Sequence, residues 1–75
     1  MAGPVKRSVT IAGHETSISL EGIFWDALKR EADAAALPIN ALIAQIDVLR
    51  IKAADPPNLA SAIRVWLMER AARNR

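Results

Sequence analysis

Residues 8–20 alternate apolar and hydroxyl-bearing side chains with a period of two. This alternation, rich in β-branched residues, predicts β-structure with one buried and one exposed face. Gly13 and His14 interrupt the pattern near its middle, where they can form a two-residue turn. The predicted apolar face holds Val9, Ile11, Thr16, Ile18 and Leu20, and the predicted hydroxyl face holds Ser8, Thr10, Ser17 and Ser19.

Two arrangements of this segment satisfy the alternation. A hairpin that turns at Gly13-His14 places Val9 opposite Ile18, and its two halves then agree on which face is apolar. Alternatively, residues 15–20 form a single strand and residues 5–12 form an arm. An isolated hairpin is marginally stable in water, so either arrangement needs helices or further strands against its apolar face.

Three helices are expected after the β-segment, over residues 21–36, 38–53 and 58–73. In the first helix, apolar residues recur at helical spacing and define one buried stripe. Pro38 suits the first turn of the second helix. Asn58 follows two prolines and is a good N-cap for the third helix.

The second predicted helix is apolar on two sides. One stripe consists of Ile39, Leu42, Ile43, Ile46 and Leu49, and the other consists of Ala41, Ala44, Val48 and Ile51. A helix that is apolar on two sides is covered on two sides, and we expect the third helix to cover the second stripe.

The length of the chain limits how much it can bury alone. A 75-residue domain has a marginal core, and small domains are usually reinforced by disulfides, metals or a partner chain. The chain has no cysteine and one histidine, so a partner chain is the remaining route. We therefore predict a homodimer whose core includes Ile18, Leu20, Trp25, Leu28, Leu42, Ile43 and Ile46.

No catalytic constellation is visible in the sequence. The single histidine, His14, is interpreted as a turn residue, and its neighbour Glu15 points to the opposite face of a strand. We expect no enzymatic activity, no cofactor and no metal. No apolar run approaches the roughly 20 residues of a membrane span, and no signal-peptide pattern follows Lys6-Arg7. A cytoplasmic protein without a membrane partner is predicted.

Positive charge gathers near both ends of a chain whose formal net charge is +2. Residues 1–7 are predicted to form a flexible basic N-terminus, and residues 8–75 a single domain. The cations at the other end, Arg64, Arg70, Arg73 and Arg75, also suit the last turns of a helix, because its C-terminal dipole attracts positive charge.

The order of strand, helix, short turn and helix resembles that of the ribbon-helix-helix family of bacterial DNA-binding proteins. The resemblance runs from about Thr16 to Arg50. A small bacterial subfamily is more similar still, with matching segments at residues 6–14, 16–21, 24–28 and 58–64. The predicted fold class is therefore mainly α with a short β-segment, in a ribbon-helix-helix dimer with an added C-terminal helix at residues 58–73.

The resemblance implies a two-fold dimer that regulates transcription. In the family, strands from two chains pair, their outward side chains read base edges in the major groove of double-stranded DNA, and the second helices hold phosphates with their N-termini. Glu15, Ser17 and Ser19 would then point outward, with Ile18 and Leu20 facing the core. The DNA-binding candidates are Lys6, Arg7, Thr10, Ser17, Ser19 and Asn40.

Three features favour an alternative function. Serine discriminates poorly between bases, and Glu15 has the wrong sign to face phosphates. Two hairpins paired edge to edge would also span about 14 Å between outer backbones, whereas the major groove is about 12 Å wide. The alternative is a dimeric module that has lost DNA binding and uses the third helix, with Trp66 and its basic end, to bind a protein partner.

Overall fold

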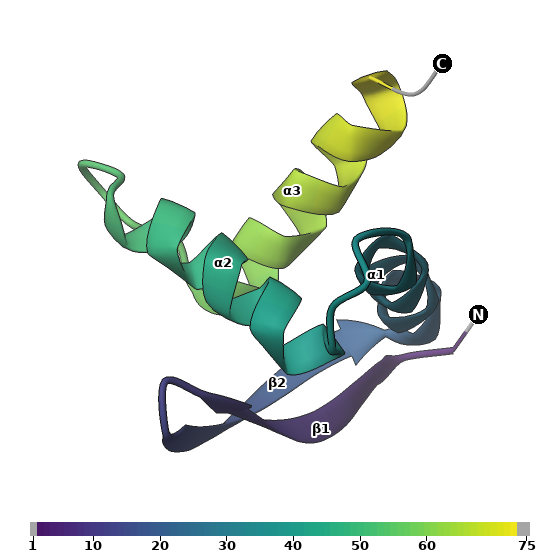
Figure 1. Cartoon of the computed structure of the whole chain (residues 1–75), viewed down its shortest axis with the longest axis horizontal. Helices are drawn as coiled ribbons and strands as arrows, with labels where there is room; N and C mark the ends of the chain where they lie inside the picture. The colour runs from purple at the N-terminus through teal and green to yellow at the C-terminus, as the bar shows by residue number, and fades with distance from the viewer. Residues whose placement is uncertain (1, 74–75) are drawn as a thin grey trace.

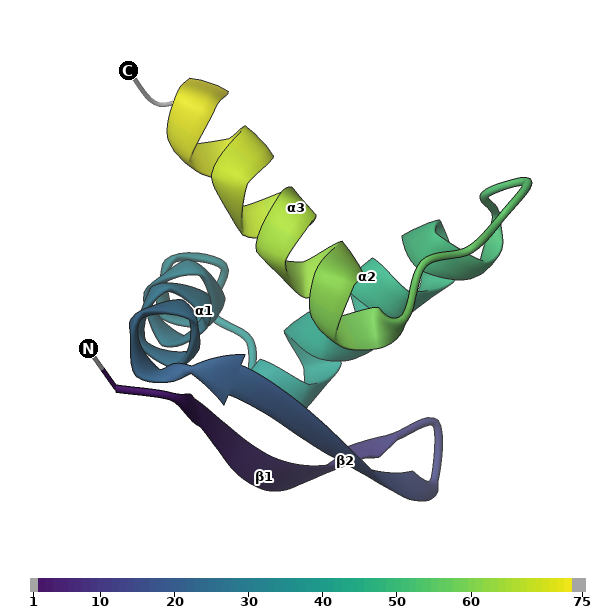
Figure 2. The same cartoon turned by 180° about the vertical axis from the view of Figure 1, so that it is seen from behind.

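A computed structural model describes residues 2–73 as a β-hairpin followed by three helices (Figure 1). The hairpin consists of β1 (Pro4–Ile11) and β2 (His14–Glu21), and the helices are α1 (Gly22–Ala34), α2 (Ile39–Ile51) and α3 (Leu59–Arg73). All three helices lie on one side of the hairpin, which leaves its other face open (Figures 1 and 2). The expected hairpin and three helices are confirmed.

The hairpin turns at Ala12 and Gly13, one residue earlier than predicted. Both residues have positive φ, 51° and 81°, as a type I′ turn requires. Val9 therefore lies opposite Thr16 and not opposite Ile18, a shift of two residues in the pairing. Because side chains alternate with a period of two, this shift leaves each one on its predicted face.

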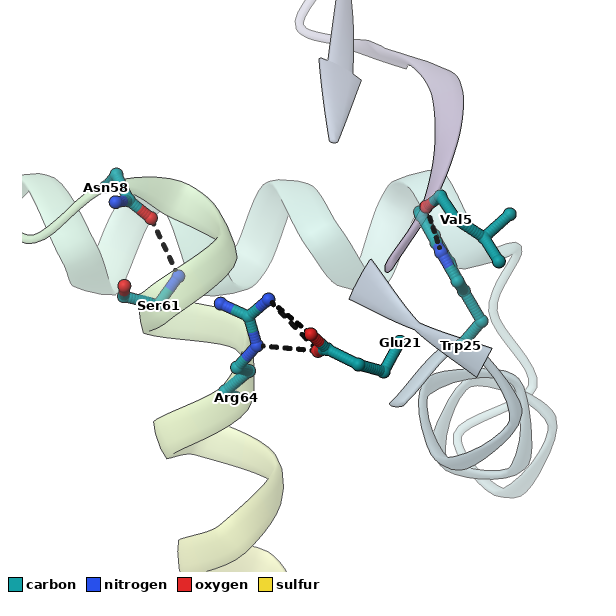
Figure 3. Close-up of polar contacts among 6 residues, drawn as sticks. All are labelled: Val5, Glu21, Trp25, Asn58, Ser61 and Arg64. Atoms are coloured by element: carbon teal, nitrogen blue, oxygen red, sulfur yellow. Dashed lines mark hydrogen bonds and ion pairs between the residues drawn. The ribbon is translucent and has the colours of Figure 1, made fainter. Parts of the chain in front are cut away.

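Strand β1 is longer than the predicted β-segment. It begins at Pro4 and pairs with β2 along its whole length, so residues 5–12 do not form a separate arm. Residues 4–7, predicted to belong to a flexible N-terminus, are part of this strand. The indole Nε1 of Trp25 donates a hydrogen bond to the Val5 carbonyl at 2.9 Å, which fixes the start of β1 against α1 (Figure 3).

The helix ends follow from local hydrogen bonds. At the end of α1, the Leu37 amide donates to the Ala32 carbonyl, 2.9 Å, and the Ala36 amide donates to Asp33, 3.1 Å. This is a Schellman motif in which Ala36, with φ of 56°, occupies the position where glycine is usual. Asn58 caps α3 as predicted, since its Oδ1 accepts the Ser61 amide at 2.8 Å (Figure 3).

A single chain encloses the hydrophobic core. Its ten buried side chains are Ile18, Leu20, Trp25, Leu28, Ala32, Leu42, Ile43, Ile46, Ile63 and Leu67. All seven residues predicted for the dimer core are among them, so their burial does not require a second copy, and their role in a dimer stays a prediction. Within residues 2–73, no buried side-chain nitrogen or oxygen lacks a hydrogen-bond partner.

Helix α3 does not cover the second apolar stripe of α2, as had been predicted. Val48 and Ile51 in that stripe remain 48% and 57% exposed. Instead α3 buries Ile63 and Leu67 in the core and reaches β2 and α1. The prediction was wrong because these longer-range contacts, rather than the stripe of α2, determine where α3 packs.

No single helix within residues 2–73 has both the length and the apolar composition of a membrane span. Helices α1 and α2 meet that test only when they are taken together across a 98° bend.

Candidate functional site

The face of the hairpin that points away from the helices is polar between residues 6 and 19. Six exposed side chains form this polar face: Lys6, Ser8 and Thr10 from β1, and Glu15, Ser17 and Ser19 from β2. They lie in three cross-strand pairs, Lys6 with Ser19, Ser8 with Ser17, and Thr10 with Glu15. One chain therefore presents a continuous polar ribbon two strands wide.

Burial of the opposite face fixes this orientation. Ile18 and Leu20 are 3% and 0% exposed, and Val9 and Ile11 pack against the same core. Turning the polar face inward would expose these four apolar side chains to water, which is unfavourable. Glu15, Ser17 and Ser19 accordingly lie on the outward face, as the alternation predicted.

Arg7 is not part of the polar face. It pairs with Ile18 in the hairpin and so belongs to the inward side of β1, where its guanidinium lies 5.2 Å from the centroid of the Trp25 ring. This geometry is that of a cation–π interaction. Of the two basic residues expected to contact DNA, only Lys6 lies on the polar face.

The N-terminus of α2 lies beside β1. Asn40 Nδ2 donates a hydrogen bond to the Thr10 carbonyl at 3.4 Å, so two of the predicted DNA-binding residues are brought together. The first backbone hydrogen bonds of the helix run from Ala41 and Leu42 to the Pro38 carbonyl. The amides of Ile39 and Asn40 precede these bonds, and such amides at a helix N-terminus attract anions.

An ion pair joins the base of the hairpin to α3. Arg64 Nε and Nη2 donate to the two carboxylate oxygens of Glu21 at 3.0 and 3.4 Å (Figure 3). A hydrogen bond from the backbone at Glu21, and after it the bond from Arg64, lower the pKa of this carboxyl. Glu21 thus remains ionised and its charge is paired, which leaves Lys6 and Glu15 as the charged groups of the polar face.

The sequence gave little sign of this ion pair. Arg64 was grouped with the cations of the C-terminal helix, and its partner is 43 residues away. Arg70 from the same group pairs with Glu31 at 3.0 Å and stacks on Trp66, while Arg73 is exposed. Arg75 lies outside the described residues.

Comparison with known families identifies the fold. The model of the ribbon-helix-helix domain matches residues 4–71. The chain belongs to the ribbon-helix-helix domain family. The match begins at the first residue of β1 and ends within α3, so the ribbon-helix-helix domain includes both elements. No curated protein and no solved structure is significantly similar to the chain.

Proposed function

We propose that this ribbon-helix-helix protein binds double-stranded DNA as a transcriptional regulator and inserts its β1–β2 ribbon in the major groove. The observation that carries the proposal is the polar face, whose six side chains are all exposed while the reverse face is packed on the helices. Members of the family typically bind DNA, which supports the same conclusion.

The width of the ribbon is compatible with this role. Neighbouring strands lie about 4.8 Å apart, and the major groove, about 12 Å wide, admits a two-stranded ribbon. Because β1 and β2 of one chain already make such a ribbon, entry into the groove does not require strands from two copies. The conflict with a four-stranded sheet arises only if two hairpins pair edge to edge.

The chemistry of the polar face favours modest sequence discrimination. The hydroxyls of Ser8, Ser17 and Ser19 donate and accept hydrogen bonds, so they contact several bases but select weakly among them. Lys6 supplies a charge for a phosphate, and the α2 amides beside Thr10 supply a second anchor. Glu15 opposes phosphate binding, since its carboxylate carries the same sign of charge.

The test is a fluorescence anisotropy titration of labelled duplex DNA at several salt concentrations. Lys6→Ala is compared with Lys52→Ala, which removes the same charge from an exposed lysine after the end of α2. Each lost phosphate contact lowers the slope of log affinity against log salt by about 0.9. We expect that change for Lys6→Ala and none for Lys52→Ala. Equal effects of the two variants, or no binding at low salt and micromolar protein, would refute the proposal.

A second candidate is a module that binds a protein partner and has lost DNA binding. The observation that favours it is an open apolar groove between α2 and α3, lined by Leu49, Val65 and Trp66 among others. Purification from the native host separates the two functions. A stoichiometric protein partner that is released by Val65→Glu, together with no salt-dependent DNA binding, supports the second candidate.

A further inference from the structure

Helix α2 carries an apolar stripe on the side that faces away from the core. This outer stripe consists of Ala41, Ala44, Val48 and Ile51. With about 100° of rotation per residue, the stripe lies opposite the side that buries Leu42, Ile43 and Ile46. Surface helices usually carry polar residues at such positions. The exposed fractions of 48% for Val48 and 57% for Ile51 mark an apolar surface without a partner in residues 2–73.

The neighbouring elements meet α2 on its other sides. Helix α3 approaches along the groove that Ile46 and Leu49 line. Strand β1 approaches at Asn40, through the hydrogen bond to the Thr10 carbonyl. Neither contact involves the outer stripe, so one chain leaves it open.

The order of side-chain sizes along the stripe indicates its occupant. The first two members are alanines, and the last two are the larger Val48 and Ile51. When two copies of α2 pack antiparallel about a two-fold axis centred between residues 44 and 48, Val48 of each copy lies opposite Ala44 of the other. Ile51 likewise lies opposite Ala41. Large residues then fill the space left by small ones at both ends, as close packing requires.

Other arrangements of the stripe do not have this match. Parallel packing would place alanine against alanine at one end, which leaves a void, and large against large at the other. The antiparallel arrangement also brings opposite ends of the two helix dipoles together. The stripe is therefore complementary in shape to a second copy of itself.

We propose that two copies of this protein associate through the outer stripes of α2, antiparallel and two-fold symmetric, and that each copy keeps its own hairpin. This inference concerns assembly alone and holds whether or not the polar face binds DNA. The competing arrangement pairs the outer edges of two β2 strands, because the sheet has only two strands and ends at β2.

Sedimentation equilibrium of the full chain without DNA tests the proposal. We expect a species of twice the 8.1 kDa chain mass for the wild type, and a monomer with unchanged circular dichroism for Val48→Glu. Ile23→Glu, which changes an apolar side chain on α1 that is 72% exposed, should remain dimeric. Ser17→Pro should also remain dimeric. Residue 17 lies at a position whose amide points away from β1, so proline there blocks only pairing at the outer edge of β2.

A residue swap tests the antiparallel register itself. Ala44→Val places two valines in contact and Val48→Ala leaves a void, so each should raise the dimer dissociation constant about tenfold or more. The double variant restores one large and one small residue at each contact and should recover most of the wild-type affinity.

Four results would overturn the proposal. The wild type is a monomer at hundreds of micromolar, Val48→Glu leaves the dimer intact, Ser17→Pro dissociates it, or the double variant is no tighter than the singles. Dissociation by Ser17→Pro alone would assign the dimer to strand pairing. None of these outcomes bears on DNA binding, which is measured separately.

Discussion

The turn of the hairpin makes a quantitative prediction, because both of its residues adopt positive φ. An L-residue in this left-handed conformation loses about 1–2 kcal/mol, and asparagine tolerates it better than alanine does. Ala12→Asn should therefore raise the free energy of unfolding by about 0.5–1 kcal/mol. For a domain of this size, that increase corresponds to roughly 2–8 °C in Tm.

Substitution of the neighbouring glycine tests the same turn in the opposite direction. A Cβ added at Gly13 meets nothing within 4 Å, so Gly13→Ala introduces no clash and acts through the backbone alone. Its left-handed strain is partly offset by a lower entropy of the unfolded chain, and we expect a net loss of about 0.5–1 kcal/mol.

Thermal unfolding followed by circular dichroism measures both effects. Ala36→Gly provides a parallel case, because Ala36 occupies the left-handed position after α1 and lies far from the turn in sequence. Its stabilisation should add to that of Ala12→Asn, as independent sites do. If Ala12→Asn and Gly13→Ala both leave Tm unchanged, the chain does not form the two-residue turn, and residues 5–12 behave as an arm.

Three further predictions concern the core and the contacts at the hairpin base. Leu20→Ala removes a fully buried side chain and should lower stability by about 2–5 kcal/mol, measured by urea unfolding. Trp25→Phe removes the hydrogen bond to the Val5 carbonyl; it should lower stability by about 0.5–1.5 kcal/mol and speed amide exchange in β1, and unchanged exchange would contradict this role. Glu21→Gln should destabilise the protein at neutral pH. Because the folded pKa of Glu21 lies below 4.5, the ionised carboxyl contributes above that pH and its contribution is lost as the pH falls through the folded pKa. The urea midpoints of wild type and variant should converge in acid, and a difference that persists there would contradict the assignment.

The faces of the hairpin could be predicted from the sequence because side-chain alternation determines them. Ser17 and Ile18 lie on the sides that the period of two assigned. The register could not be predicted. It depends on Ala12 in a left-handed conformation, for which alanine gives no signal, whereas glycine at the next position fitted either turn.

The extent and packing of the elements depended on contacts between distant residues. Strand β1 reaches back to Pro4, where the hydrogen bond from Trp25 holds it, and residue composition at the N-terminus does not reveal that bond. Helix α3 was expected on the second stripe of α2. Its ion pair with Glu21 and its buried Ile63 place it against β2 and α1 instead.

The candidate site was predicted in part. Lys6 and Thr10 share the outward face with the β2 hydroxyls, in agreement with the alternation once β1 is extended. Arg7 was assigned to a flexible segment and was therefore given no face, although its odd position in the strand places it with Val9 on the inward side. The contact between Asn40 and Thr10 joins residues 30 apart and could not be read from local pattern.

Chemical-shift mapping tests the central claim most directly, namely that one chain forms a two-stranded ribbon whose polar face binds DNA. The ¹⁵N-labelled protein is titrated with a short duplex at low salt. We predict that the largest amide shifts occur at Lys6, Thr10, Ser17 and Ser19, with a smaller group at the start of α2, and that Met68 on α3 does not shift. Shifts that gather on α2 and α3 while the hairpin signals stay fixed would contradict the account.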